Sequence, residues 1–347
     1  MEHRDCVPLV EVTRGNIVES IHQGAFCVVD SRGTMLACER NPALLTYPRS
    51  SLKPFQALPF IEIDGDSAFN LAEKEIAIMC ASHAGTDKHM AVVRRMQEKI
   101  GISEADLQCG SAWPGDAKTH QTMNIKGDQP SPIRHNCSGK HTGMLAHAKM
   151  RGYDLGDYLD LKHPVQMTIR KVIGEMAGLE PEDMPSGIDG CSVPVYALPL
   201  QNMAQAVARL ADPAMLDPVR KAACSRITSA MMNNPDMISG EGRFDTELMS
   251  VVPGKVFSKG GAEGFHIAGI MPGVVREGSP GIGIAIKIAD GDRKFRARSC
   301  VLVKILLALG VLDEDDLRQI PTFGFSPIHN ARKMVVGQVR PCISINL

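Results

Sequence analysis

This chain of 347 residues has no large excess of positive or negative charge. It carries 38 lysines and arginines against 39 aspartates and glutamates, which leaves a formal net charge of -1. A protein that holds the phosphates of nucleic acid needs a cationic surplus, and this composition does not supply one. We therefore exclude nucleic acid as a partner.

Long hydrophobic runs are missing as well. No apolar run reaches the roughly 20 residues that a bilayer-spanning helix needs. The first residues, Met1 to Cys6, mix charges of both signs and lead into no apolar signal core. With 44% hydrophobic and 22% charged residues, the composition is that of an ordinary globular protein. We expect a cytoplasmic protein without a membrane partner.

Closely spaced cysteine pairs are also missing. The ten cysteines are scattered along the chain and form no C-x-x-C pair, which excludes a disulfide framework. Most are expected to pack as small apolar side chains, as Cys27, Cys38, Cys80 and Cys300 would in their apolar runs. Two others, Cys137 and Cys191, are considered separately below.

Internal repeats, low-complexity tracts and long linkers do not occur, so the simplest expectation is a single α/β domain over residues 1–347. The apolar runs predict strands first, then a helical layer from about 73 to 232, then strands and a helix. The particular predictions are a hairpin at 25–39, helices at 73–80, 87–100, 140–150, 163–176, 197–210, 218–232 and 295–309, and strands at 255–258 and 281–288. The Gly/Pro/Asn-rich stretches 108–136 and 233–254 are predicted to be irregular, functional loops.

The stretch Tyr47–Pro54 places a serine and a lysine three residues apart where a helix is predicted to begin. Pro54 fits only in the first helical turn, which puts Ser50 at or just before the helix N-terminus, on the same face as Lys53. A serine hydroxyl needs a neighbouring base to attack an amide, and lysine serves only when its amine is neutral. The alternative is a serine-rich cap with a solvated lysine, and the spacing alone favours that alternative.

Two further stretches place polar groups at the ends of predicted elements. Ser82 and His83 lie at a boundary between two helices, where capping by Thr86 or Asp87 leaves Ser82 unexplained. Lys259 ends a predicted strand and is followed by two glycines, which would let a substrate approach the backbone. The alternative for the second stretch is a simple turn.

The stretch His135–Gly143 contains Gly139-Lys140 before a helix, but it is not a phosphate-binding loop. Such a loop needs glycine in place of Arg134 and serine or threonine in place of His141. Zinc binding is the sharper hypothesis, with Cys137 joined by His135 or His141 and by the distant Cys191. Buried free thiols are the alternative, and the spacing favours them.

Taken together, these stretches resemble the motif order of serine β-lactamases and penicillin-binding proteins. The closer resemblance is to the asparaginase II family of the Rhizobium etli type, also called class 3 asparaginases. It rests on five stretches in order across almost the whole chain: Tyr47–Pro54, Cys80–His83, His135–His141, Asp189–Cys191 and Ser258–Gly264.

The resemblance implies a β-lactamase-like fold, an antiparallel sheet flanked by helices with a large helical layer. We expect a homodimer, and the resemblance also implies hydrolysis of L-asparagine by two Ser-Lys tandems, Ser50 with Lys53 and Ser82 with Lys259. Its zinc ion would be held by Cys137, Lys140 and Cys191, with Asp189 beside it. Lys255 is a second lysine near the last of these strands that is easily mistaken for Lys259.

The expected reaction begins with attack by Ser50, with Lys53 as the base, and we expect zinc not to be required for the chemical step. Arg49 and Asp189 are our choices to bind the carboxylate and the ammonium of the amino acid. The first rival is a penicillin-binding or β-lactamase-type enzyme, whose substrates lie outside the cytoplasm. The second is a zinc-stabilised binding protein without catalysis.

Overall fold

The computed structural model describes residues 5–345, so residues 1–4, on which the expected localisation partly rests, lie outside the described residues. Backbone contacts divide the chain into two compact units. The first unit holds the chain up to Ser51, Leu198–Asp212 and the chain from Glu247 onward. The second holds Leu52–Ala197 and Pro213–Thr246. The single domain over residues 1–347 stays a prediction.

An eight-stranded antiparallel sheet forms the centre of the first unit. Seven of its strands lie in the order β11-β12-β1-β2-β10-β9-β8. The eighth strand, β3, pairs with β2 as a branch of the sheet. The strand bounds are β1 (Val7–Arg14), β2 (Ile17–Asp30), β3 (Met35–Glu39), β8 (Val256–Gly260), β9 (Phe265–Ile270), β10 (Ile282–Ile288), β11 (Pro327–His329) and β12 (Val335–Pro341). A separate pair joins β4 (Leu45–Thr46) to β7 (Leu198–Pro199).

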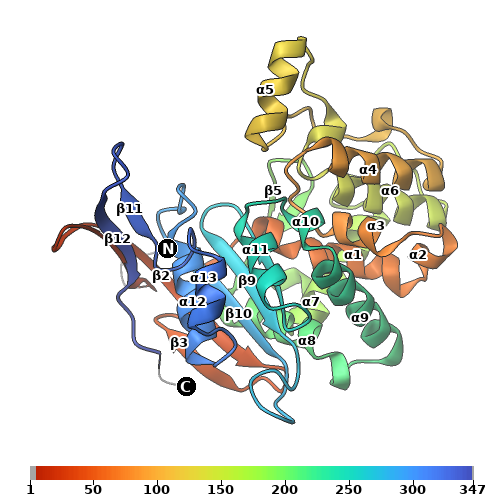
Figure 1. The fold of residues 1–347 in the computed structure, drawn as a ribbon. Coiled ribbons are helices and arrows are strands. Elements are labelled where there is room, and N and C mark those ends of the chain that lie inside the picture. Colours follow the sequence, from red (N-terminus) through yellow and green to blue (C-terminus); the bar gives the residue numbers. More distant parts are fainter. Residues whose placement is uncertain (1–4, 346–347) are drawn as a thin grey trace. The chain divides into compact units, whose positions relative to one another are not determined.

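Two helices pack on this sheet. α8 (Leu200–Ala211) contacts β10 and β2, and α12 (Ala297–Ala308), which lies across the strands in Figure 1, contacts β10, β12 and β1. A Cβ at Gly283 in β10 would lie 2.0 Å from the backbone oxygen of Ala204, so glycine allows α8 to come close. β10 is buried along its whole length. The short helix α13 (Glu314–Gln319) follows α12.

The buried helix α1 (Lys53–Glu62) forms the centre of the second unit. Its residues 53–61 are all buried, and α6, α7 and α9 pack around it. Pro54 falls in the first turn as predicted, because the amide hydrogen that proline lacks has no helical acceptor there. The other helices of this unit are α2 (Gly65–Ala68), α3 (Glu73–Met79), α4 (Asp87–Ile100), α5 (Ala117–Lys126), α6 (Ser138–Arg151), α7 (Pro164–Ala177), α9 (Pro218–Asn233) and α10 (Pro235–Ile238). α11 (Phe244–Val251) begins in this unit and ends in the first.

Short 3-10 turns connect several elements. They are η2 (Arg49–Leu52), η3 (Glu104–Asp106), η4 (Pro132–Arg134), η5 (Pro181–Asp183) and η6 (Pro213–Met215). A small hairpin of β5 (Ser186–Ile188) and β6 (Pro194–Tyr196) interrupts the helical unit, and its connection carries Asp189 and Cys191. This hairpin was not predicted.

The predicted fold class, an antiparallel sheet flanked by helices with a large helical layer, is confirmed. The hairpin at 25–39 and the late strands are present, and the helix predicted at 295–309 is α12. The helix predicted to begin at residue 197 begins at Leu200, because Leu198–Pro199 pairs as β7. Cys27, Cys80 and Cys300 are buried as predicted, whereas Cys38 is only half-buried.

The prediction that 108–136 and 233–254 are irregular throughout was wrong. The first contains α5, whose start is capped by Asp116 accepting from the Thr119 amide and whose end is Gly127 in the left-handed region. These capping residues specify a helix between irregular flanks. The second stretch contains α10 and α11.

Over residues 5–345, no helix is both long enough and apolar enough to cross a membrane.

Candidate active site

Ser50 lies in the 3-10 turn η2 that leads directly into α1. The residue before it, Arg49, has φ of 54°, in the left-handed region that a side chain with a Cβ rarely adopts. Such a conformation costs on the order of 1–3 kcal/mol and persists where the surroundings hold it, often at functional sites. The backbone therefore presents Ser50 from a strained position.

Lys259 lies near the end of β8, fully buried in the first unit. Its backbone oxygen accepts a hydrogen bond from Ser51 Oγ at 2.9 Å, and its Nζ donates to the Gly260 oxygen at 2.6 Å. A Cβ at Gly261 would lie 2.4 Å from the Pro48 oxygen. The turn after Lys259 therefore lies directly against the segment that carries Ser50. Lys255, the lysine easily mistaken for Lys259, is exposed.

Lys53, the first residue of α1, is 1% exposed. Its Nζ donates to the Ala81 oxygen at 2.5 Å, to Ser82 Oγ at 3.0 Å and to the Asn136 oxygen at 3.2 Å. A buried amine must be satisfied by such partners, and these three use all the donors of an ammonium group. The contact with Ser82 links residues of the two predicted Ser-Lys tandems within the second unit.

Ser82 lies between α3 and α4, where its backbone amide donates to the Ile238 oxygen at 2.8 Å. The next residue, His83, is buried and contacts Ser138 Oγ through Nε2 at 2.9 Å. The Gly85 amide donates to His83 Nδ1, so the ring hydrogen is on Nε2. Burial lowers the pKa of His83 well below its usual range, which keeps the ring neutral. His83 thus ties the Ser82 segment to the start of α6.

Cys137, Lys140 and Cys191, the three predicted zinc ligands, come together in the second unit, and all three are buried. Lys140 Nζ lies 2.8 Å from Cys191 Sγ. A hydrogen bond from Cys191, helped by Lys53 and Lys140, lowers the pKa of Cys137 well below its usual range, and the same bond raises the pKa of Cys191. This is the environment of a thiolate, the form in which cysteine binds metal.

The amine of Lys140 is the donor that fits zinc least well. Burial by itself lowers the pKa of Lys140, but the neighbouring Cys137 and Cys191 raise it overall. A lysine must lose its proton before it can bind a metal. Among residues 5–345, no three side chains drawn from His, Cys, Asp and Glu are grouped as a metal site. The donor set therefore fits zinc only as two thiolates and a deprotonated lysine.

Arg49 and Asp189, the predicted substrate-binding residues, are both half-buried. Arg49 belongs to the first unit and Asp189 to the second. Asp189 lies near enough to Lys140 to help raise its pKa. Its amide donates to the Val193 oxygen, which fixes it at the tip of the β5–β6 hairpin.

Sequence reasoning missed two contributors to these arrangements. Ser51 holds the backbone of Lys259, and the Asn136 carbonyl holds Lys53. Both stand inside stretches that were singled out, next to a predicted site residue. Adjacency was thus the available signal, but nothing in the sequence indicates which neighbour makes the contact.

Three comparisons with known proteins bear on these residues. No curated protein matches this chain significantly. Similar solved structures include Mglu (TM-score 0.46, 13% identity, covering 85% of this chain and 69% of that one). They also include a probable glutaminase of Bacillus subtilis (TM-score 0.40, 13% identity, covering 83% of this chain and 88% of that one). A third is a probable glutaminase from Bacillus subtilis complexed with 6-diazo-5-oxo-L-norleucine (TM-score 0.39, 13% identity, covering 83% of this chain and 84% of that one). At these TM-scores the similarities support no conclusion about this chain.

The comparison with family models is decisive. The model of the L-asparaginase II family matches residues 10–341, which include every stretch described above. The chain belongs to the L-asparaginase II family.

Proposed function

We propose that this protein hydrolyses L-asparagine to L-aspartate and ammonia. Family membership supports the class of reaction. The observation that carries the mechanism is the buried amine of Lys53, which begins α1 three residues after Ser50 and contacts Ser82 Oγ at 3.0 Å. A buried amine in contact with a serine hydroxyl is an arrangement that can activate a serine nucleophile.

In the proposed reaction Ser50 Oγ attacks the carbonyl carbon of the asparagine side chain. Lys53 takes the hydroxyl proton, for which its amine must first be neutral. Backbone amides beside Ser50 stabilise the negative charge on the carbonyl oxygen. Collapse of the tetrahedral intermediate breaks the C–N bond and leaves an aspartyl ester on Ser50.

The leaving amide nitrogen needs a proton in order to depart as ammonia. In our proposal the hydroxyl of Ser82 supplies it and regains a proton from Lys53, which took one from Ser50, while Lys259 assists this relay. The contact between Lys53 Nζ and Ser82 Oγ supports the transfer from Lys53 to Ser82. Water then attacks the ester, Lys53 accepts a proton from that water and returns it to Ser50 Oγ, and aspartate leaves with Ser50 and Lys53 restored.

Recognition of a free amino acid requires a cation for its carboxylate and an anion for its ammonium group. We assign these roles to Arg49 and Asp189. The strained backbone at Arg49 supports a functional role for that residue. The position of Asp189 beside the buried cluster of Cys137, Lys140 and Cys191 supports a link between recognition and zinc.

We further propose that zinc is held by Cys137, Lys140 and Cys191. When bound, the ion supplies a fixed positive charge that holds the β5–β6 connection in place. The serine and lysine chemistry needs no metal-activated water. Asp189 then orients the substrate, and the chemical step stays with Ser50 and Lys53.

Chelation of zinc is expected to raise KM for asparagine by roughly one order of magnitude, about 1.4 kcal/mol of binding free energy, while kcat stays measurable. The reason is that losing the ion repositions Asp189 without removing Ser50 or Lys53. Steady-state kinetics before and after chelation measure this split. Cys137→Ser should behave like the chelated protein, and Cys342→Ser, at an exposed cysteine, is the matched control.

Two results would contradict the zinc proposal. Metal-free protein that remains folded by circular dichroism but shows no turnover at saturating asparagine would make zinc catalytic. Purified protein in which elemental analysis finds no zinc would leave Cys137 and Cys191 as buried thiols.

The experiment that tests the proposed function is ammonia release from a panel of amides, with asparagine and glutamine foremost. We expect release from asparagine and no hydrolysis of nitrocefin. Hydrolysis of nitrocefin without release from asparagine would favour the β-lactamase-type rival. If no amide releases ammonia, nitrocefin is not hydrolysed, and Ser50→Ala binds ligands as wild type does, a binding protein would be favoured.

A further inference from the structure

Buried cations hold the turn that follows Lys259. The Arg298 guanidinium donates to the Gly261 oxygen and, at 3.2 Å, to the Phe265 oxygen. The Lys287 amine donates to the Glu263 oxygen. Arg298 and Lys287 are 8% and 6% exposed, respectively. Three backbone oxygens of this short turn, those of Gly261, Glu263 and Phe265, thus accept from charged side chains that come from elsewhere in the first unit. Other oxygens of the turn accept from backbone amides.

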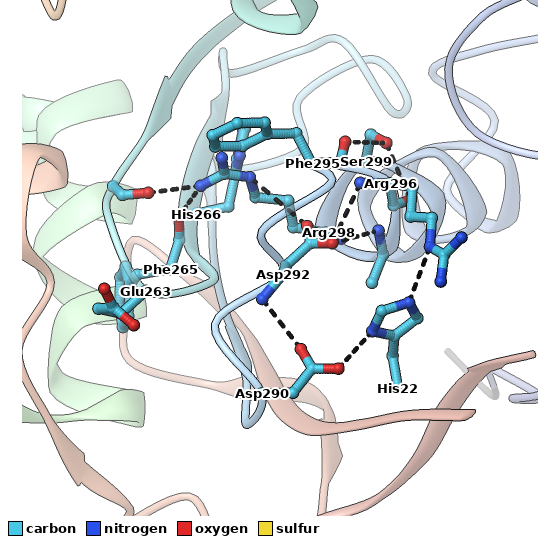
Figure 2. A network of polar contacts seen from close by, with 12 residues as sticks. His22, Glu263, Phe265, His266, Asp290, Asp292, Phe295, Arg296, Arg298 and Ser299 are labelled. Atoms are coloured by element: carbon cyan, nitrogen blue, oxygen red, sulfur yellow. Dashed lines mark hydrogen bonds and ion pairs between the residues drawn. The ribbon is translucent and has the colours of Figure 1, made fainter. Parts of the chain in front are cut away.

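Arg298 is itself fixed on several sides (Figure 2). Asp292 is fully buried, and its Oδ2 accepts from the Arg298 amide at 3.1 Å and lies 3.7 Å from the Arg298 Nε. The Phe295 ring stacks under the guanidinium, 4.6 Å from its central carbon. A buried guanidinium is tolerated only where it is paired and hydrogen-bonded in this way. The side chain therefore has a single orientation.

The loop that carries Asp292 is anchored in turn. Asp292 Oδ1 accepts from the amides of Arg296 and Ala297, which fixes the start of α12. The Asp292 amide donates to Asp290, and Asp290 contacts His22 on β2 at 2.6 Å. Figure 2 shows this chain of contacts from His22 to Arg298. Contacts from β2 and from the loop before α12 thus hold the Arg298 side chain in place.

Gly261 is where this support meets the candidate site. It lies so close to Pro48 that a Cβ would be 2.4 Å from the Pro48 oxygen and 3.0 Å from Ser51 Oγ. Its own oxygen is the acceptor of Arg298. A displacement of the Gly261 carbonyl would therefore disturb the packing of the turn after Lys259 against the segment that bears Ser50. Lys287 acts at Glu263, an exposed residue farther along the turn.

We propose that Arg298, oriented by Asp292, is a positioning residue that fixes the turn after Lys259 against the Ser50 segment. It touches no reacting atom and acts through the Gly261 carbonyl. This inference rests on the proposed function insofar as Ser50 and Lys259 are catalytic. The alternative is a purely structural role, in which Arg298 only stabilises the packing of α12 on the sheet.

The test compares Arg298→Ala, Arg298→Lys and the control Arg340→Ala. Arg340 pairs with Glu11 on the same sheet, but it is 45% exposed. Arg298→Ala is expected to lower kcat for asparagine about 100-fold with little change in KM, because a displaced catalytic group affects the chemical step more than binding. Arg298→Lys keeps a donor for the Gly261 oxygen, so its kcat should be about tenfold higher than that of Arg298→Ala and about tenfold lower than that of wild type. Arg340→Ala should match wild type.

Two further measurements separate positioning from stability and from the proposed function. Thermal unfolding confirms that each variant is folded at the assay temperature. Amide hydrogen exchange over residues 259–265 should be faster in Arg298→Ala than in wild type or Arg340→Ala. If wild type releases ammonia from no amide, the proposed function fails. Faster amide exchange in Arg298→Ala that is confined to residues 259–265 would still show that Arg298 holds this turn in place.

Wild-type kcat and wild-type exchange in folded Arg298→Ala would overturn the inference. A loss of kcat that follows only the unfolded fraction, with no recovery in Arg298→Lys, would leave the packing alternative. If Arg298→Ala does not fold, Arg298→Lys decides. A folded Arg298→Lys with kcat lowered about tenfold and KM unchanged supports the inference, and wild-type kcat overturns it.

Discussion

Ser50→Ala and Lys53→Met are each expected to lose at least ~10³-fold in kcat for asparagine, and the double variant should lose little more. The effects are not additive because the hydroxyl and the amine act as one unit, and removing either leaves the other without a role. Methionine keeps the length of the lysine side chain. Steady-state ammonia release measures the effect.

Stability must be followed in the same variants. Lys53→Met leaves the Ala81 and Asn136 oxygens without their donor, a loss on the order of 1–3 kcal/mol for each buried group. Ser225→Ala removes an exposed serine on α9 that bonds only within its helix, and it is the matched control. A folded Ser50→Ala protein with substantial activity would remove Ser50 from the role of nucleophile.

Gly261→Ala is expected to lower kcat about 100-fold in a protein that still folds. The added methyl group would lie 2.4 Å from the backbone oxygen of Pro48, and a backbone atom cannot swing away as a flexible side chain can. The turn after Lys259 and the Ser50 segment must therefore separate. Kinetics with asparagine, together with the unfolding temperature, measure the result.

Gly156→Ala is the matched control, because its Cβ would meet only the Asp154 side chain at an ordinary distance of 3.5 Å. It should keep wild-type kcat. If Gly261→Ala also keeps wild-type kcat, the close contact with Pro48 does not matter to catalysis, and the role given to Arg298 loses its basis too.

Local patterns predicted much of the fold. Pro54 placed the start of α1 correctly, because proline is tolerated only where its missing amide hydrogen has no partner. The hairpin of β2 and β3 followed from two apolar runs around a glycine turn. The same reasoning missed α5 because its capping residues, Asp116 and Gly127, were taken for loop composition.

Contacts between distant residues are what the sequence does not show. Ser51 and Lys259 are 208 positions apart, and only the folded sheet brings the Ser51 hydroxyl to the Lys259 carbonyl. Arg298 carries no motif that would mark it as a support for the turn after Lys259. The residues themselves indicated Cys137 and Cys191 as possible zinc ligands, the family resemblance added Lys140, and the fold brings Lys140 to Cys191. Zinc binding, a cytoplasmic location and a homodimer remain predictions.

The most direct test of the central claim is to stop the reaction with asparagine during turnover and map the covalent state of the protein by mass spectrometry. We predict an aspartyl ester on the peptide that contains Ser50. The ester should be absent in Ser50→Ala and should reach a higher occupancy in a variant in which hydrolysis of the ester is slowed. An ester on Ser82, or continued ammonia release by Ser50→Ala with no ester on any serine, would contradict the account.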